Sequence, residues 1–263
     1  MEFREGAFDF QTSQQKYAIL NGNRRKVMKS NREIKKQAKE LLAGHWGSAI
    51  LLNLVPTLLV IVVFVLIGIP SIWALSSITQ DTSTTILTNV SSDNDPNYMV
   101  TLGANIIGTL FITAITWTFL DLLRGTKQKI NPLSDAFRAF QSPFLLAVVI
   151  ICILISIFQS LWFLLFVIPG IIKGYSYSQS YTILYDTYQH TGEKMGYLDS
   201  ITASRRLMNG YKMQLFLLDL SFIGWHILCL FTAGIGYLWL TPYIVASHTA
   251  FYDSLPKEEA LVF

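Results

Sequence analysis

The chain has 263 residues, of which 52% are hydrophobic and only 14% are charged, and its mean hydropathy is +0.42. Soluble domains carry about 25% charged residues, so this composition argues against a wholly water-soluble protein. The net charge of +3 comes without a long basic run interleaved with aromatic residues, so we expect no nucleic-acid partner. Cys152 and Cys229 lie inside apolar stretches, and we interpret them as small buried residues rather than as a disulfide.

Residues 1–27 differ in character from the rest of the chain and are expected to be either a non-native extension or a disordered cytoplasmic tail. The segment from Arg24 to Met28 can be encoded by a purine-rich ribosome-binding sequence just before a start codon. One hypothesis therefore makes Met28 the native first residue.

The next segment has the pattern of an amphipathic helix. Ser30 and Glu33 have the spacing of a capping box, in which each side chain bonds the other residue's backbone amide. Apolar residues then fall on one helical face, and a glycine at position 44 is expected to end the helix. Such a helix suits the anionic cytoplasmic interface of a membrane. The expected lipid-headgroup contacts are Lys35, Lys36 and Lys39 here, and Arg205 and Arg206 in a similar basic segment further on.

Six later stretches are apolar enough to cross a bilayer, whose hydrocarbon core takes about 20 helical residues. We expect an all-α integral membrane protein with six transmembrane helices in three hairpins, each preceded by a cytoplasmic amphipathic helix. The membrane domain is expected at residues 28–255 and a cytoplasmic tail at 256–263, with Pro169–Gly170 as a tight outer turn. The predicted crossings are residues 48–73, 100–122, 144–168, 171–188, 213–231 and 235–251.

The distribution of cations predicts the orientation. If both termini lie inside, nineteen of the twenty Lys and Arg residues fall on the cytoplasmic side, and the exception, Lys173, lies within a crossing. Because cytoplasmic loops are enriched in Lys and Arg, the sequence predicts a multi-pass protein of the cytoplasmic membrane with N and C termini inside.

The unit of amphipathic helix, stop and hairpin occurs three times, which suggests an internal repeat. The run from Leu41 to Gly44 aligns with the run from Leu207 to Gly210 at the same spacing from the apolar stretch that follows. The three return helices end alike, in Asp121, Asp186 and Asp253. The alternative is that hairpin ends favour such residues and that short matches in apolar sequence arise easily.

From Met28 onward the chain resembles an uncharacterised integral-membrane family of Gram-positive bacteria, domain of unknown function 975. The resemblance rests on MKSNREIKKQAKELLAGHWGSAI, PGIIKGYSYSQSYTILYD and SRRLMNGYKMQLFLLDLSFIGWHIL. It implies the membrane fold and supplies no catalytic residue. More distantly, the chain resembles the membrane domain attached to some glycerophosphodiester phosphodiesterases, whose catalytic barrel has no counterpart here.

Polar residues at membrane depth are costly and therefore mark candidate sites. Counted from the helix ends, Asn105, Gln159, Lys173 and His226 fall at similar depth and could form a polar layer that binds an anionic headgroup or a small solute. The alternative, which we favour, is hydrogen bonding between helices, or Lys173 extending its ammonium to the outer interface. Asp219 lies near the inner third of the fifth crossing. It could be a proton-relay carboxylate, or a partner of Tyr and Ser hydroxyls or of Arg205 or Lys212 at the interface.

Tyr177, Tyr181 and Tyr185 stand at helical spacing and could line a groove, although such a stripe is more often a packed seam. His226 and Cys229 share a helical face, but without a third converging ligand we expect no metal site. The sequence also contains no catalytic or cofactor-binding motif, so we expect no enzyme and no cofactor.

Two functions remain open at this point. The first is a non-enzymatic accessory protein that interacts with membrane lipids, or with a membrane protein partner, through its basic helices. The second is a small-solute or lipid transporter, or an export component, that uses the polar layer and the tyrosine stripe.

Overall fold

The computed structural model describes residues 28–63, 65–66, 69–70, 96–141 and 143–257. The expected N-terminal extension (1–27), most of the expected outer loop and nearly all of the expected tail lie outside this part. Within it the secondary structure is helical and includes no strand.

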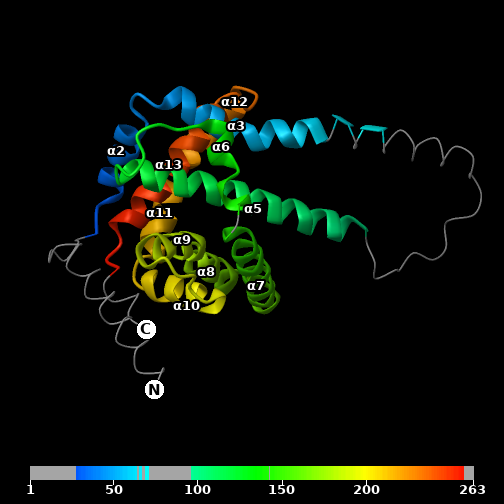
Figure 1. The fold of residues 1–263 in the computed structure, drawn as a ribbon, viewed down its shortest axis with the longest axis vertical. Helices are drawn as coiled ribbons and strands as arrows, with labels where there is room; N and C mark the ends of the chain where they lie inside the picture. Colours follow the sequence, from blue (N-terminus) through cyan, green and yellow to red (C-terminus); the bar gives the residue numbers. More distant parts are fainter. Residues whose placement is uncertain (1–27, 64, 67–68, 71–95, 142, 258–263) are drawn as a thin grey trace, which may run out of the picture.

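The order of the helices follows the predicted crossings, with additional breaks (Figure 1). They are α2 (Asn31–Leu42), α3 (Trp46–Val63), α5 (Pro96–Leu123), α6 (Pro132–Ala136), the 3₁₀ helix η2 (Arg138–Phe140), α7 (Phe144–Leu165), α8 (Val167–Tyr177), α9 (Ser180–Thr191), α10 (Tyr197–Leu207), α11 (Lys212–Leu220), α12 (Ile223–Phe231) and α13 (Tyr237–Ser254).

Three helical stretches are long and apolar enough to cross a membrane: Gly103–Leu123, Phe144–Leu165 and Lys212–Phe231. A fourth candidate is the pair Asn31–Leu42 and Trp46–Leu59, which is bent by 95°. Large apolar side chains cover the outer surface of these helices, with Leu164 83% and Phe231 84% exposed. An exposed apolar surface of this kind is expected of helices that face lipid.

The predicted fourth crossing, residues 171–188, is not one helix. Two helices, α8 and α9, occupy it, with a break at Ser178–Gln179. The predicted turn at Pro169–Gly170 is also wrong, because the chain turns at the extended residue Phe166 and both residues lie in the first turn of α8.

Proline is tolerated in a first turn because its missing N–H has no intrahelical acceptor there. A Cβ on Gly170 would stand 2.7 Å from the Phe163 ring, so glycine at this position allows α8 to pack closely against α7.

The interior is built around α5 and α13, each of which contributes to both hydrophobic clusters of the described chain. Trp117 and Phe119 of α5 and Phe251 of α13 are fully buried. Ser247 and Thr249 of α13 are buried as well, and their hydroxyls donate to backbone carbonyls of the same helix at 2.7 and 2.9 Å. Within the described residues α13 is therefore a core helix with a partly polar interior.

The helix α2 begins at the predicted capping box, in which the side chains of Ser30 and Glu33 each bond the other's backbone amide. Its apolar residues Ile34, Ala38 and Leu42 are fully buried, and α13 is the helix against which α2 packs most extensively (Figure 1). The apolar face of α2 is therefore covered by protein rather than facing lipid.

Candidate functional site

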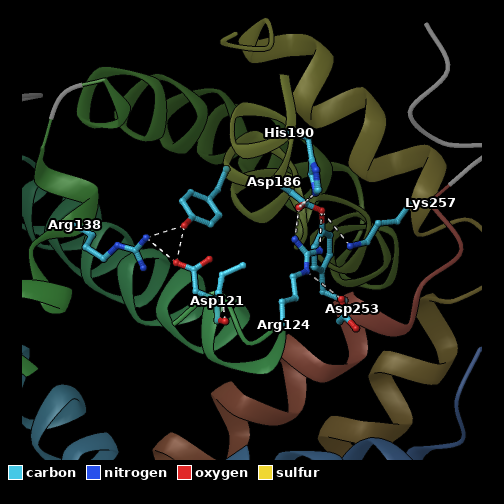
Figure 2. A network of polar contacts seen from close by, with 10 residues as sticks. Asp121, Arg124, Arg138, Asp186, His190, Asp253 and Lys257 are labelled. Atoms are coloured by element: carbon cyan, nitrogen blue, oxygen red, sulfur yellow. Dashed lines mark hydrogen bonds and ion pairs between the residues drawn. The ribbon is translucent and has the colours of Figure 1, made fainter. Parts of the chain in front are cut away.

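The most concentrated group of charges in the described chain surrounds Asp186 of α9 (Figure 2). This carboxylate is 1% exposed and receives both terminal nitrogens of Arg124, at 2.5 and 3.1 Å. Lys257 Nζ donates to it at 3.1 Å and the Tyr252 hydroxyl at 2.7 Å. The His190 Nε2 atom lies 3.3 Å from the other carboxylate oxygen.

Two further carboxylates extend the cluster. Arg124 Nε donates to Asp253 at 3.2 Å, so one guanidinium joins two aspartates. Nearby, Arg138 pairs with Asp121 at 2.8 Å, and the Tyr185 hydroxyl accepts from Arg138 and donates to Asp121, both at 2.7 Å. We call these groups together the helix-end network (Figure 2). Its members are Asp121, Arg124, Arg138, Tyr185, Asp186, His190, Tyr252, Asp253 and Lys257.

The electrostatics keep the two arginines of the network charged. Burial lowers the pKa of Arg124, but the hydrogen bond and charge of Asp186 outweigh burial and raise the pKa above its ordinary value. For Arg138, contacts with Tyr185 and Asp121 likewise outweigh burial and raise its pKa. Burial lowers the pKa of Lys257, and Asp186 offsets part of this effect.

The helix-end network acts as a connector because its members come from several elements: the carboxyl-terminal ends of α5 and α13, the second half of α9 with Tyr185 just before it, and η2, which supplies Arg138. Arg124 follows α5, Asp186 and His190 lie in α9, and Asp253 and Lys257 lie at and beyond the end of α13. The acceptor positions of Asp186 are taken by groups of the protein itself. The arrangement therefore holds three helix ends together rather than presenting an open carboxylate.

A second polar cluster involves the predicted residue Asp219. Its Oδ1 lies 2.5 Å from Nε2 of His248 on α13, and its Oδ2 accepts the Tyr175 hydroxyl at 3.0 Å. The side chains of His248 and Asp219 are 36% and 33% exposed. This cluster joins α8, α11 and α13. His248 was not predicted as a partner of Asp219, because nothing in the sequence indicates which faces of two distant helices meet.

The other residues of the predicted polar layer contact different neighbours. Gln159 Nε2 donates to the Gly170 carbonyl at 2.6 Å, and Lys173 lies 4.4 Å from the centre of a tryptophan ring on α7. His226 Nδ1 lies 3.3 Å from a tyrosine hydroxyl in its own hairpin, and Asn105 is exposed on α5. Gln159 and Lys173 lie on the neighbouring helices α7 and α8. Among the described residues, no set of contacts joins all four members of the predicted layer. In this part of the chain no three His, Cys, Asp or Glu side chains form a candidate metal site.

The predicted tyrosine stripe is divided by the break between α8 and α9. Tyr177 and Tyr185 are buried, and Tyr185 stacks on Trp117 with ring centroids 4.6 Å apart. The backbone carbonyl of Tyr181 accepts the indole N–H of the same tryptophan at 3.2 Å. Tyr177 and Tyr185 therefore pack inside the protein, and Tyr185 belongs to the helix-end network.

The five predicted headgroup contacts differ in their exposure and in the groups that they contact. Lys36 is exposed and pairs with Glu40 of the next turn at 3.8 Å, while Lys35 and Lys39 lie over aromatic rings of neighbouring elements. Arg205 and Arg206 are exposed on α10.

Sequence analysis missed the pairing of Arg124, Arg138 and Lys257 with the three aspartates. The available signal was the recurrence of aspartate at the ends of three return helices, which was interpreted as a repeat rather than as a site.

The fold and these contacts define a class of all-helical proteins with three to four helices long and apolar enough to cross a membrane. In this chain a charged cluster joins α5, one of these helices, to α9 and α13. The chain belongs to the family described as "Protein of unknown function (DUF975)", whose model matches residues 28–173 and 163–259. No curated protein and no solved structure matches the chain significantly.

Proposed function

We propose that this chain is a non-enzymatic accessory protein of the cytoplasmic membrane that interacts with anionic lipids or with a partner protein through its basic helices. The observation that carries the proposal is the position of the cations on α2 and α10. Lys36, Lys39, Arg205 and Arg206 are exposed, while each helix also has a row of buried residues: Ile34, Ala38 and Leu42 on α2, and Ile201, Ala203 and Leu207 on α10. The helices are thereby fixed in position with their charges directed outward, where anionic headgroups attract them.

The proposal includes a multi-pass topology with both termini inside. The helix-end network supports this topology because it gathers the ends of α5, α9 and α13, the three predicted return helices, at one face of the molecule. Three return helices that all run inward would end on the same side, as this clustering requires.

Cysteine labelling tests the topology. In cells, Asn89→Cys should react with a membrane-impermeant thiol reagent added from outside, and Lys129→Cys should react only after the membrane is opened. Lys129 is exposed, and the native Cys152 and Cys229 are buried and give a low background. External labelling of Lys129→Cys, or protection of Asn89→Cys, would overturn the topology.

Co-purified lipid tests the accessory role. Neutralising Lys35, Lys36, Lys39, Arg205 and Arg206 to Gln should lower the ratio of phosphatidylglycerol to phosphatidylcholine bound in mixed micelles, and 1 M salt should lower it for the unmodified chain by screening. A pull-down from solubilised membranes compares the protein partners of the same two chains. If both the lipid ratio and the protein partners are unchanged, the proposal is wrong.

A second candidate, a small-solute or lipid transporter, is favoured by the contact between Asp219 and His248, since a carboxylate–imidazole pair that is about one third exposed can exchange a proton. Vesicles that contain the chain should then show substrate-dependent proton movement, and Asp219→Asn should abolish it. Equal proton movement by the two chains would remove this support.

A further inference from the structure

A cavity of about 450 Å³ lies between the elbow of α2 and α3 and the hairpin of α12 and α13. Its walls are mostly apolar and include three indoles, from Trp46, Trp225 and Trp239, together with Leu228 and Leu240. Sites for small ligands have volumes of about 300–1,000 Å³ and combine apolar walls with a few polar groups. We call this space the indole cavity.

One charged side chain, Lys39, is among the described residues that line the indole cavity. Its ammonium lies 5.8 Å from the ring centre of Tyr243, another lining residue. One helical turn earlier, the ammonium of Lys35 lies 4.4 Å from the ring centre of Phe222 and donates to the Ser221 carbonyl at 3.4 Å. Lys39 therefore places a positive charge in the wall of the apolar space, and Lys35 carries another one helical turn away.

Within the described chain, neither Lys35 nor Lys39 has a carboxylate within ion-pair distance, whereas Lys36 on the same helix pairs with Glu40 at 3.8 Å. Aromatic rings attract cations but do not neutralise them. An anion that bridges one helical turn would complement both ammonium groups, since residues four apart on a helix are about 6 Å apart.

These observations define a ligand with two parts. The apolar walls favour a hydrocarbon chain, and indoles are common at the depth where acyl chains meet headgroups. The two lysines favour a phosphate at the rim of the same space. We propose that the indole cavity binds one acyl chain of an anionic phospholipid and that the phosphate of this lipid contacts Lys39 and Lys35. This inference rests on the proposed lipid-interacting role and assigns that role a site.

Native mass spectrometry of the full-length chain in detergent tests the assignment, with phosphatidylglycerol and phosphatidylcholine of identical acyl chains as probes. One phosphatidylglycerol molecule should bind at least fivefold more tightly than phosphatidylcholine, since each cation near a phosphate contributes about fivefold. A free fatty acid of the same chain length and soluble glycerol phosphate should each bind more weakly than the intact lipid.

The variant Lys35→Gln/Lys39→Gln should reduce the preference for phosphatidylglycerol at least fivefold. The matched control is Lys129→Gln/Lys194→Gln, which removes the same charge from exposed positions outside the expected headgroup contacts and should keep the preference. Leu228→Trp narrows the cavity and should weaken binding of both phospholipids, while Leu230→Trp, at a position that is 70% exposed, should not. Thermal unfolding of each variant verifies that it is folded.

Equal binding of the two phospholipids by the unmodified chain would overturn the inference, as would equal effects of the two charge-changing variants. Fatty-acid binding as tight as that of phosphatidylglycerol would also overturn it, because the phosphate would then contribute nothing. The five-cation variant of the accessory-role test could lose its lipid preference while Lys35→Gln/Lys39→Gln keeps its preference and Leu228→Trp keeps its affinity. In that case the accessory role stands and only this assignment fails.

Discussion

The helix-end network and the rim of the indole cavity hold their cations in opposite ways. In the network Arg124 and Lys257 contact the buried carboxylate of Asp186, so the positive charges are matched inside the protein. At the cavity rim Lys35 and Lys39 lie over aromatic rings, with no carboxylate partner in the described chain. The comparison indicates that matched charges hold the fold, whereas unmatched charges are available to an external anion.

The largest effect is expected from Asp186→Ala. This change leaves Arg124 and Lys257 buried without their main counter-charge, and breaking a buried pair in this way costs about 3–5 kcal/mol. Unfolding in detergent micelles, followed by near-ultraviolet circular dichroism, should show that loss. The exposed Glu193→Gln should change the unfolding free energy by about 0.5 kcal/mol or less. If Asp186→Ala unfolds like the unmodified chain, the network does not hold the helix ends.

A smaller loss is expected from Arg124→Lys, which keeps the charge but not the planar fork that reaches both Asp186 and Asp253. Lost charge-assisted hydrogen bonds of this kind cost about 1–3 kcal/mol, measured in the same unfolding assay. Arg205→Lys, at an exposed position, serves as the control and should be neutral. In combination with Asp186→Ala the effect should be less than additive, because the two residues act as a unit. Full additivity would show that they act separately.

An intermediate loss of stability is expected when the contact between Asp219 and His248 is broken, since both side chains are about one third exposed. Asp219→Asn should lower the unfolding free energy by about 1–2 kcal/mol, because the amide replaces a carboxylate that bonds both an imidazole and the Tyr175 hydroxyl. The same change in a His248→Gln background should have a much smaller effect. An equal effect in both backgrounds would indicate that the contact contributes nothing to stability.

The smallest effect on stability is expected from Lys35→Gln/Lys39→Gln. Exposed contacts between a cation and a ring contribute about 0.5–1 kcal/mol each, so the double variant should lose about 1 kcal/mol or little more. Its unfolding should resemble that of Lys129→Gln/Lys194→Gln, although its lipid preference should differ. A loss as large as that of Asp186→Ala would show that the two regions are not distinct.

Local features of the fold could be predicted from the sequence because they depend on residues within one or two turns. The capping box of Ser30 and Glu33 forms as expected. Gly44 and Gly210, which end the two basic helices, adopt φ values of +81° and +84°, a left-handed conformation that costs glycine little. The long apolar helices α5 and α7 lie close to their predicted bounds, since hydrophobic length is a property of the segment itself.

The tertiary structure alone decided which distant groups meet. Arg124 pairs with Asp186, 62 residues away, only because the ends of α5 and α9 converge. The apolar face of α2 is covered by α13 although its pattern would suit a membrane surface equally well, since periodicity shows that a face is buried but not what buries it. Likewise, the break between α8 and α9 and the closeness of Lys39 to the indole cavity depend on packing between helices, which no local pattern encodes.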